Sequence, residues 1–380
     1  MTRPPAAQKL PRLCFVGPMV GRHPGHLTAQ GLILSELIRA TGYPVISTSE
    51  KLNRYMRASD IANTLARERH NIDILIIEVY GGPSFVIEDI ASWLGRQFGH
   101  RIIMWLHGGA LPEFMARFPA WTNRVLRRAD LLVAPSQFLA KTVTRHGFQA
   151  KVIPNVIDLS LYDYRHRRSV EPRLFWMRGF HPIWNPEMAI HTLARLRVEV
   201  PEASLVMAGP DKGTRVDVER LAQELGVADG VRFAGFLDAK GKAVEAAAAD
   251  IYINTNRVDN MPVAVVEAMA FGLPVVTTAV GGIPDLLKHG DTGLFVPVND
   301  QEAMVRAIQS LLKNPELAAR LSANGRCLAE QSSWDRVRQP WEELFATLAG
   351  RSTAKAREHP LAGSHRELAK ALDDGSMETL

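Results

Sequence analysis

Residues 251–298 read IYINTNRVDNMPVAVVEAMAFGLPVVTTAVGGIPDLLKHGDTGLFVPV, and this stretch decides the fold. It predicts a strand, a loop, a helix, a second strand, a loop, a short helix and a third strand. The first strand is the β-branched and aromatic run 251–254, which suits a buried position. Pro262 suits the first helical turn, because that turn does not need its N–H group. The sequence Gly272-Leu273-Pro274 ends the helix.

Two carboxylates flank the start of the helix predicted from Pro262. Asp259 lies on the loop before it, and Glu267 lies about one turn inside it. The first N–H groups of a helix have no partner within it, and together with the helix dipole they form an anion-binding site. Two acids beside such a site can hold the hydroxyl groups of a sugar and of a ribose. The pattern therefore predicts a pocket for a nucleoside diphosphate-sugar.

Several motifs in this stretch occur in the order of a known donor site. Asp259 and Glu267 are followed by Ala-Met-Ala-Phe-Gly-Leu-Pro-Val-Val, Val-Gly-Gly-Ile-Pro-Asp and Gly-Asp-Thr-Gly-Leu-Phe-Val. The series resembles the signature of the retaining glycosyltransferases of family 4, which have the two-domain GT-B fold. That family usually has Glu where this chain has Asp259, which is one methylene shorter. The alternative interpretation is a solvated loop acid and a helix acid in an ordinary α/β domain.

The resemblance implies roles for residues along this stretch. Asp259 and the backbone N–H groups of Asn260 and Met261 would hold hydroxyl groups of the transferred sugar. Glu267 would accept hydrogen bonds from the ribose. Val263 lies in the first turn of the helix, where the diphosphate would rest. Asp259 is therefore a candidate catalytic residue, and the others are candidate donor-binding residues.

Composition argues against several classes of protein. The 380 residues are 46% hydrophobic and 22% charged, which is ordinary for a globular enzyme with an ample core. Cys14 and Cys327 lie far apart, which argues against a disulfide scaffold or a thiolate zinc site and favours a reducing cytoplasm. The N-terminus lacks the apolar core of a signal peptide, and no apolar run reaches membrane-spanning length. The net charge of +5 favours an anionic partner, such as a nucleotide, a phospholipid surface or an acidic glycan.

A glycine-bearing loop follows the first predicted strand, at 13–16. It contains Gly17, Gly21 and Gly25. Glycines between a strand and a helix allow the backbone to approach a ligand phosphate closely. The resemblance places this loop across the cleft from the donor phosphates, so the three glycines are candidate donor-binding residues. The spacing is not GxGxxG, so nicotinamide binding is not expected, and a plain turn is the alternative interpretation.

Two near-continuous apolar runs, 72–79 and 101–106, predict further buried strands of a parallel sheet. The second run ends at His107. Open α/β sheets bind ligands at the carboxyl ends of their strands, and the resemblance likewise implies a histidine near the donor sugar and the acceptor. His107 is therefore a candidate catalytic residue that contacts the transferred sugar. A capping or core histidine is the alternative interpretation.

Aromatic and basic side chains alternate in residues 111–128, which read LPEFMARFPAWTNRVLRR. Such a mixture suits an amphipathic segment that lies on an anionic membrane surface. Pro119 interrupts the segment, and helices at the edge of a core also carry arginines. Peripheral contact with the inner face of the membrane through 111–128 is the minor hypothesis beside a purely cytoplasmic location.

Arg178 follows a strand predicted at 173–177 and is the candidate group for gripping the donor diphosphate. A planar guanidinium at the mouth of a sheet can form paired hydrogen bonds with phosphate oxygens. The resemblance supports this role, catalytic and donor-binding, and implies a lysine shortly afterwards that is missing here. Lys212 or a group of the N-terminal domain is the expected substitute. The alternative interpretation of Arg178 is a surface ion pair. Phe236 lies on a later turn, which the resemblance places beside the nucleotide base.

Strands alternate with helical runs through both halves of the chain. This pattern indicates an α/β protein with two doubly wound Rossmann-like domains that face each other across a cleft, the GT-B architecture. The polar run 164–173 is the expected linker. The expected parts are an acceptor-side domain at 1–165, a nucleotide-sugar domain at 166–332, a helix at 333–350 that crosses back to the first domain, and a mobile tail at 351–380.

The preferred function is that of a retaining transferase. It would move a sugar from a UDP- or GDP-linked donor to a hydroxyl group of a glycan or lipid-linked acceptor, in glycan, polysaccharide or glycolipid biosynthesis. The chain has no DxD triplet, so no catalytic metal and no cofactor are expected, and protein cations would meet the phosphate charge. Nucleic acid is not an expected partner. Three alternatives remain: a sugar-nucleotide epimerase, a non-catalytic sugar-nucleotide-binding protein and a membrane-bound assembly factor.

Overall fold

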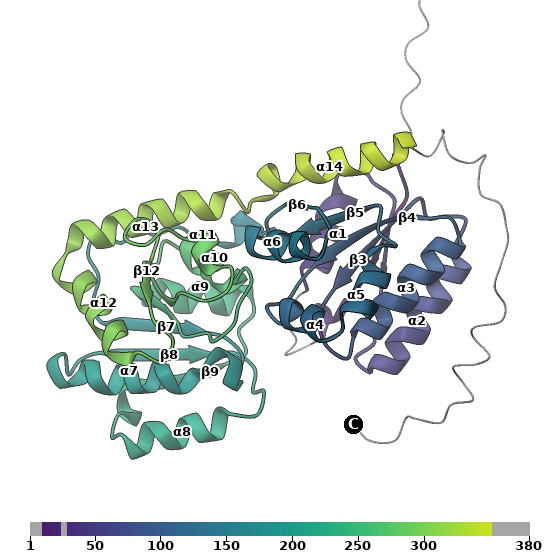
Figure 1. The fold of residues 1–380 in the computed structure, drawn as a ribbon. Helices are drawn as coiled ribbons and strands as arrows, with labels where there is room; N and C mark the ends of the chain where they lie inside the picture. The colour runs from purple at the N-terminus through teal and green to yellow at the C-terminus, as the bar shows by residue number, and fades with distance from the viewer. Residues whose placement is uncertain (1–9, 24–28, 352–380) are drawn as a thin grey trace, which may run out of the picture.

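The chain forms two α/β domains, each built on a six-stranded parallel sheet (Figure 1), so the predicted fold class is confirmed. The structure is a computed structural model that describes residues 10–23 and 29–351. The first sheet contains β1 (Leu13–Val16), β2 (Val45–Thr48), β3 (Ile74–Val79), β4 (Arg101–Leu106), β5 (Leu131–Ala134) and β6 (Ala150–Val152). The second contains β7 (Arg173–Met177), β8 (Ser204–Ala208), β9 (Val231–Gly235), β10 (Ile251–Asn254), β11 (Val275–Thr278) and β12 (Leu294–Val296). The tail predicted at 351–380 lies outside the described residues, apart from Arg351 at the end of the last helix.

The order of the strands creates one switch point in each sheet. The first sheet runs β2-β1-β3-β4-β5-β6, and the second runs β12-β11-β10-β7-β8-β9. In the first sheet the chain adds β2 on one side of β1 and then β3 on the other side. In the second sheet it adds β8 on one side of β7 and later β10 on the other side. The switch points therefore lie between β1 and β3 and between β7 and β10. Open α/β sheets bind ligands beyond the carboxyl ends of the strands at such points. Each domain thus offers one favoured position for a ligand.

Alternate residues of each strand face opposite helical layers. In the first domain Cys14 and Val16 belong to the core on one face of the sheet, and Leu13 and Phe15 belong to the core on the other. Helices α2 (Arg54–Arg67), α3 (Phe85–Gln97), α4 (Leu111–Arg117), α5 (Pro119–Leu126) and α6 (Gln137–Arg145) contribute to the first core. Helices α1 (Gln30–Ala40) and α14 (Trp334–Arg351) contribute to the second. Since α14 is the last helix described, distant parts of the chain complete this domain.

The second domain repeats the arrangement. Leu174 and Trp176 of β7 pack in one core, and Phe175 and Met177 pack in the other. Helices α7 (Pro186–Glu199), α8 (Arg215–Glu224) and α12 (Gln301–Lys313) contribute to the first core. Helices α9 (Ala239–Ala248), α10 (Val263–Ala270) and α11 (Ile283–Leu286) contribute to the second, and α13 (Pro315–Glu330) reaches both. The layer that contains α10 positions the carboxylates of the predicted donor site.

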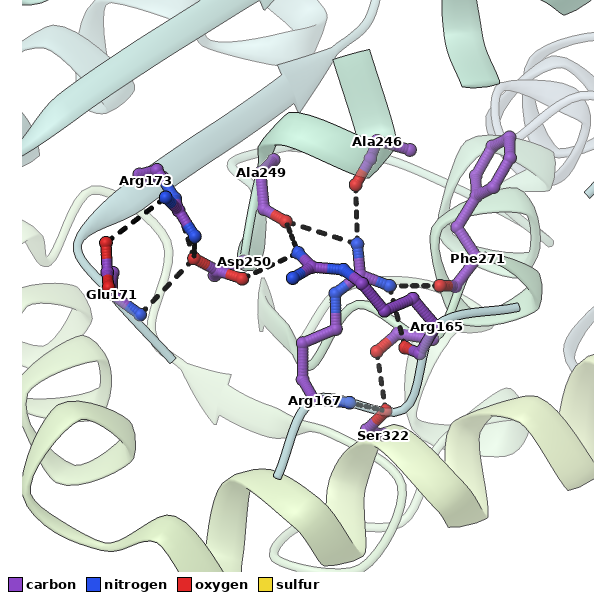
Figure 2. Close-up of polar contacts among 10 residues, drawn as sticks. Arg165, Arg167, Glu171, Arg173, Ala246, Ala249, Asp250, Phe271 and Ser322 are labelled. Carbon is purple, nitrogen blue, oxygen red and sulfur yellow. Dashed lines mark hydrogen bonds and ion pairs between the residues drawn. The ribbon is translucent and has the colours of Figure 1, made fainter. Parts of the chain in front are cut away.

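The linker predicted at 164–173 is anchored to the second domain by arginines (Figure 2). Arg167 is only 2% exposed, and its guanidinium donates to the main-chain oxygens of Ala246, Ala249 and Phe271. These oxygens lie at the C-terminal ends of α9 and α10, where carbonyl groups lack helical partners and the helix dipole is negative. Arg165 adds an ion pair with Asp250 at 2.7 Å. The polar linker is therefore a cap for two helices as well as a connection.

The chain passes between the domains twice, and the two passages lie side by side. The first comprises residues 153–172 and includes the 3-10 turn η2 (Leu159–Leu161). The second comprises residues 331–333, immediately before α14. The Ile157 N–H donates to the Ser332 oxygen at 2.8 Å, and Ile157 pairs with Ser333 as an isolated bridge. The two domains are thus joined by a short double connection.

Candidate active site

A cavity of about 860 Å³ lies between the two domains. The first domain lines it with residues of α1 and of the 3-10 turn η1 (Val20–Arg22), among them Gln30 and Gly21. The second domain lines it with the residues after β7, β9 and β10 and with the first turn of α10. Because β7 and β10 meet at the switch point of the second sheet, the cavity lies where this architecture places ligands.

Arg178 and Asp259 meet at this switch point. Arg178 directly follows β7, and Asp259 lies on the loop between β10 and α10. Their side chains form an ion pair, and the Asn256 side-chain amide donates to the same carboxylate oxygen. The other carboxylate oxygen accepts the Asn260 N–H at 2.7 Å. The Asp259 carboxylate therefore has a fixed orientation at the wall of the cavity.

The Gly281-Gly282 turn fixes the loop that carries Asp259. A methyl group at Gly281 would lie 1.8 Å from the Asp259 main-chain oxygen, and one at Gly282 would lie 1.8 Å from the Asn260 oxygen. The Gly282 N–H also donates to the Asp259 oxygen at 3.2 Å. Gly281 has a φ of +54°, in the left-handed region that glycine adopts without strain. The motif therefore requires glycine at both positions, because a side chain there would collide with the main-chain oxygens of Asp259 and Asn260.

Asn260 contacts both its neighbour Asp259 and the first domain. Its N–H donates to the Asp259 carboxylate, and that it holds a sugar hydroxyl stays a prediction. Its side-chain oxygen accepts the Ser136 hydroxyl of the first domain, so Asn260 joins the two domains. Met261 does line the cavity, and the Asn155 N–H lies 3.5 Å from its sulfur.

Glu267 lines the cavity and already has two hydrogen-bond partners. Its Oε1 accepts the Tyr162 hydroxyl at 2.8 Å and lies 2.7 Å from the Lys242 Nζ. Burial raises the pKa of Tyr162 well above its ordinary value, and the neighbouring Glu267 carboxylate raises it further. The hydroxyl therefore stays protonated and donates. Tyr162, in the linker, and Lys242, at the start of α9, were not predicted as site residues.

The N-terminal end of α10 opens on the cavity between these two acids. Pro262, Val263 and Ala264 all line it. Pro262 is the N-cap, its backbone is extended, and no side chain caps the first N–H groups. Since the N-terminus is the positive end of the helix dipole, this end of α10 attracts an anion in the cavity.

The second cation of the cavity is Lys242, not Lys212. Lys212 is exposed and does not line the cavity, and its side-chain stem packs beside Gly179. Trp184, the last residue of the 3-10 turn η3 (Pro182–Trp184), stands near the point where the resemblance implies a lysine, and its ring also packs against Gly179. Arg178 and Lys242 are the cations that the second domain places in the lining. That Lys212 or a group of the N-terminal domain substitutes for the missing lysine stays a prediction.

The remaining predicted donor-binding residues are divided between sites. Phe236 lines the interdomain cavity at the turn after β9, and its side chain is 37% exposed. Gly21 lines the same cavity from the first domain. Gly17 instead lines a smaller cavity within the first domain. Gly25 lies outside the described residues.

His107 is buried in the first domain and does not line the interdomain cavity. Its ring stacks on Tyr80 with 5.1 Å between centroids and tilts against Trp105 at 4.4 Å. Burial lowers the pKa of His107 to about 3, so the ring is neutral. Its Nε2 lies 3.5 Å from a carboxylate oxygen of Glu78. The structure therefore places His107 beside the smaller cavity.

The loop that follows His107 nevertheless reaches the donor side of the cleft. A methyl group at Gly109 would lie 2.8 Å from the Val258 side chain and 3.2 Å from the Asp259 Cα. The ends of β4 and β10 thus face each other across the domain boundary. Groups at the end of β3 and β4 lie on the same side of the molecule as the Asp259 loop.

In the part of the chain that the structure describes, no group of three or more His, Cys, Asp or Glu side chains is arranged to hold a metal ion. None of the described helices is both long enough and apolar enough to cross a bilayer.

The basic and aromatic residues of 111–128 make contacts within the first domain. The guanidinium groups of Arg124 and Arg128 both pair with Asp89 of α3. The Trp121 indole donates to the same carboxylate at 2.7 Å, and its ring packs edge-on against Phe85. Internal packing therefore accounts for this alternation of residue types, and the described contacts give no support to membrane binding.

Two family profiles match consecutive parts of the chain. The profile described as "Glycosyltransferase Family 4" matches residues 16–161. The profile described as "Glycosyl transferases group 1" matches residues 171–327. The two matches correspond to the two sheets, and together they cover the residues that line the interdomain cavity except Tyr162.

Two characterised relatives and one solved structure illustrate the similarity. The chain is 25% identical over 307 residues to the N-acetyl-alpha-D-glucosaminyl L-malate synthase of Bacillus anthracis, covering 76% of this chain and 77% of that protein. It is 27% identical over 285 residues to the D-inositol 3-phosphate glycosyltransferase of Geodermatophilus obscurus, covering 70% of this chain and 62% of the relative, which is under two thirds of the relative's length. The Anabaena Alr3699/HepE structure in complex with UDP and glucose superposes with a TM-score of 0.71 at 19% identity, covering 89% of this chain and 100% of that one.

Proposed function

Because the chain belongs to glycosyltransferase family 4 and has the GT-B fold, we propose that it transfers a sugar from a nucleoside diphosphate-sugar to a hydroxyl group with retention of anomeric configuration. The observation that carries the proposal is the placement of Asp259 and Glu267 beside the N-terminal end of α10, within one interdomain cavity. An anion at the helix end would have an acid on each side to bind a hydroxyl-bearing ring.

The departing nucleoside diphosphate gains negative charge, and three features face that charge. They are the N-terminal end of α10, the Arg178 guanidinium and the Lys242 ammonium. Fixed positive groups that face a developing charge stabilise the transition state without having to reorganise. Arg178 lines the cavity and pairs with Asp259 through one terminal nitrogen, so the other terminal nitrogen of its guanidinium can bind a phosphate while the ion pair is kept. These protein cations support a reaction that needs no metal ion.

Asp259 and Glu267 are assigned to different halves of the donor. The Asp259 carboxylate, held by Arg178 and Asn256, would bind hydroxyl groups of the sugar and stabilise positive charge that develops on its ring. Glu267 would bind the ribose hydroxyls. In that complex Tyr162 and Lys242 either share Glu267 with the ribose or turn toward the phosphate.

The donor and the acceptor are proposed by class. The Anabaena structure contains UDP and glucose, which supports a UDP-linked sugar, and a GDP-linked sugar is the other candidate. The acceptor is a hydroxyl group of a glycan or a lipid-linked sugar, in the synthesis of a glycan, polysaccharide or glycolipid. Both cysteines are free thiols, which supports a cytoplasmic location.

Calorimetric titration with UDP and GDP tests the assignment. Glu267→Ala is expected to weaken nucleoside diphosphate binding by about tenfold, because a charge-assisted contact to the ribose is lost. Asp259→Ala is expected to keep most of the affinity for the bare nucleotide and to lose turnover of the nucleotide-sugar. Glu113→Ala, at an exposed position on α4, is the matched control. Equal loss of binding and turnover in both site variants, or a wild type that binds neither nucleotide, would contradict the proposal.

A further inference from the structure

A second, smaller cavity of about 240 Å³ lies at the switch point of the first sheet. It is lined by Gly17 after β1 and by Glu78 and Tyr80 at the end of β3, and β1 and β3 are neighbouring parallel strands. Ser84 and Glu88 close it from α3 and the turn before it. The position is the one that the strand order favours for a ligand. Its volume lies below the roughly 300–1,000 Å³ that holds a drug-sized molecule, so it suits one small ring.

Two buried carboxyl groups face this cavity, and each has one oxygen that no described residue pairs with by a hydrogen bond. Glu78 is 2% exposed and Glu88 is 3% exposed. Tyr80 engages the other oxygen of each: its N–H donates to Glu88 at 3.1 Å, and its hydroxyl donates to Glu78 at 3.3 Å. The Gly31 N–H also donates to Glu78 at 2.8 Å. The Oε2 atoms of both acids remain unpaired.

Unpaired carboxyl oxygens at such depth have a cost to folding. Buried polar groups are normally paired, and each exception calls for a reason such as a binding or catalytic role. Burial raises the pKa of both acids, which is consistent with two carboxyl groups that lack compensating partners. A ligand that brings hydroxyl donors would supply the missing hydrogen bonds.

The rest of the lining favours a neutral ligand over a cationic one. Arg57 lines the same cavity, and its guanidinium donates to the main-chain oxygens of Lys51 and Leu52. Its positive charge would oppose an ammonium group held by the two acids. The Ser84 hydroxyl and the Tyr80 ring add a polar group and a flat face, as hydroxyl-bearing rings require. Because burial favours the neutral form of both acids and Arg57 is positively charged, the lining points to a ring with neutral hydroxyl groups.

The cavity also lies beside the side of the cleft where transfer would occur. Glu78 is 3.5 Å from the His107 Nε2, and the loop after His107 contacts the Asp259 loop. A ring held by the two acids would therefore sit in the first domain at the edge nearest the proposed sugar site.

On the premise of the proposed function, we propose that this cavity is the acceptor subsite and that it binds a single neutral polyol ring, a sugar or a cyclitol, through hydroxyl groups that donate to Glu78 and Glu88. The residues determine which acceptor the enzyme takes, and they do not contact the nucleotide.

Saturation-transfer NMR with free rings tests the subsite. The probes are glucose, galactose, mannose and myo-inositol, with glucosamine as the cationic counterpart, each added to the full chain saturated with the nucleotide that binds in calorimetry. At least one neutral probe is expected to bind the wild type. Glu88→Gln and Glu78→Gln are expected to weaken that binding by about tenfold, because an amide NH2 group, which cannot accept a hydrogen bond, replaces one carboxyl oxygen. Ser84→Phe, which fills the cavity and leaves both acids in place, is expected to abolish it.

Controls separate this result from the proposed function. Glu113→Gln, an exposed acid on α4, is expected to leave probe binding unchanged, and all four variants are expected to bind the nucleotide like the wild type. Binding of glucosamine alone, or neutral binding that survives Glu78→Gln, Glu88→Gln and Ser84→Phe, would overturn the subsite. A wild type that binds nucleotide but no probe also overturns it and leaves the transferase proposal standing. A wild type that binds no nucleotide defeats the transferase proposal and the subsite with it.

Discussion

At the scale of single residues, Glu78 and Glu88 set how the first domain responds to pH. Burial raises the pKa of Glu78 to about 7 and that of Glu88 to about 8, from an ordinary value of 4.5. At pH values between 4.5 and these raised pKa values, the two carboxyl groups stay protonated in the folded protein but are ionised in the unfolded chain. Unfolding then releases protons, so the free energy of unfolding falls as pH rises from about 4.5 to 8, by up to about 3 kcal/mol for Glu78 and about 5 kcal/mol for Glu88.

Replacing both acids by Gln is expected to remove this fall. Denaturant unfolding at several pH values measures it, and the double variant should gain stability relative to the wild type as pH rises from 5 to about 8. The comparison must be relative, because His107, whose pKa burial lowers to about 3, stabilises the fold as pH rises toward 6.5. Glu113→Gln serves as the control. Parallel pH profiles for the wild type and the double variant would contradict the prediction.

Some site residues were predictable from the sequence, and others were not. Asp259 and Glu267 belong to one contiguous series of motifs, and Arg178 directly follows a strand that the sequence predicts. Their positions in the sequence were therefore enough to select them. Tyr162 and Lys242 reach Glu267 from the linker and from α9, and only tertiary packing brings them together. The sequence around Tyr162 and Lys242 contains no motif or periodic pattern that would identify them as site residues.

At the scale of elements, the ends of helices in the second domain are held by groups that lie far away in sequence. The N-terminal end of α10 is left uncapped and faces the cavity. Its C-terminal end, together with that of α9, is capped by Arg167 from the linker. A polar composition predicted only that 164–173 connects two domains, because composition does not reveal which of its arginines is buried.

Arg167→Met is expected to destabilise the second domain by about 2–4 kcal/mol. The substitution keeps an apolar stem and leaves the carbonyl oxygens of Ala246 and Phe271 without a charged donor, while Arg165 still donates to the Ala249 oxygen at 2.8 Å. Urea unfolding followed by circular dichroism measures the loss. Arg168→Met, at the exposed neighbouring position, is the matched control and should change stability by less than about 0.5 kcal/mol. Equal stabilities of the two variants would show that the cap contributes little.

At the scale of the whole molecule, the two sheets were predictable because all their strands are parallel and buried. Such strands appear as continuous apolar runs, and the predicted bounds of β1, β4 and β7 agree with the structure. The strand order and the contact between the two passages were not predictable, because neither leaves a periodic pattern. The same limit explains why the small cavity was missed: Gly17, Glu78 and Glu88 converge only when β1 and β3 pair.

Trp341→Ala tests how strongly the last helix supports the first domain. Trp341 is fully buried and packs edge-on against Trp105 of β4 with 5.2 Å between centroids. The variant is expected to lose about 3–5 kcal/mol of unfolding free energy, because a large cavity replaces the indole. Val198→Ala, at a surface position of α7 that is 82% exposed, is the control. A loss below about 1 kcal/mol would mean that α14 is a dispensable attachment.

The route of α14 also has a consequence for biosynthesis. A ribosome releases the six strands of the first sheet early, but the helix that covers one of its faces emerges only with residues 334–351. Until then the nascent chain exposes an apolar surface that includes Leu13, Ile76 and Trp105. Domains usually fold in the order in which they are made. Here the lobe that is made first must be finished last, so the newborn chain depends on chaperones or on rapid completion of translation.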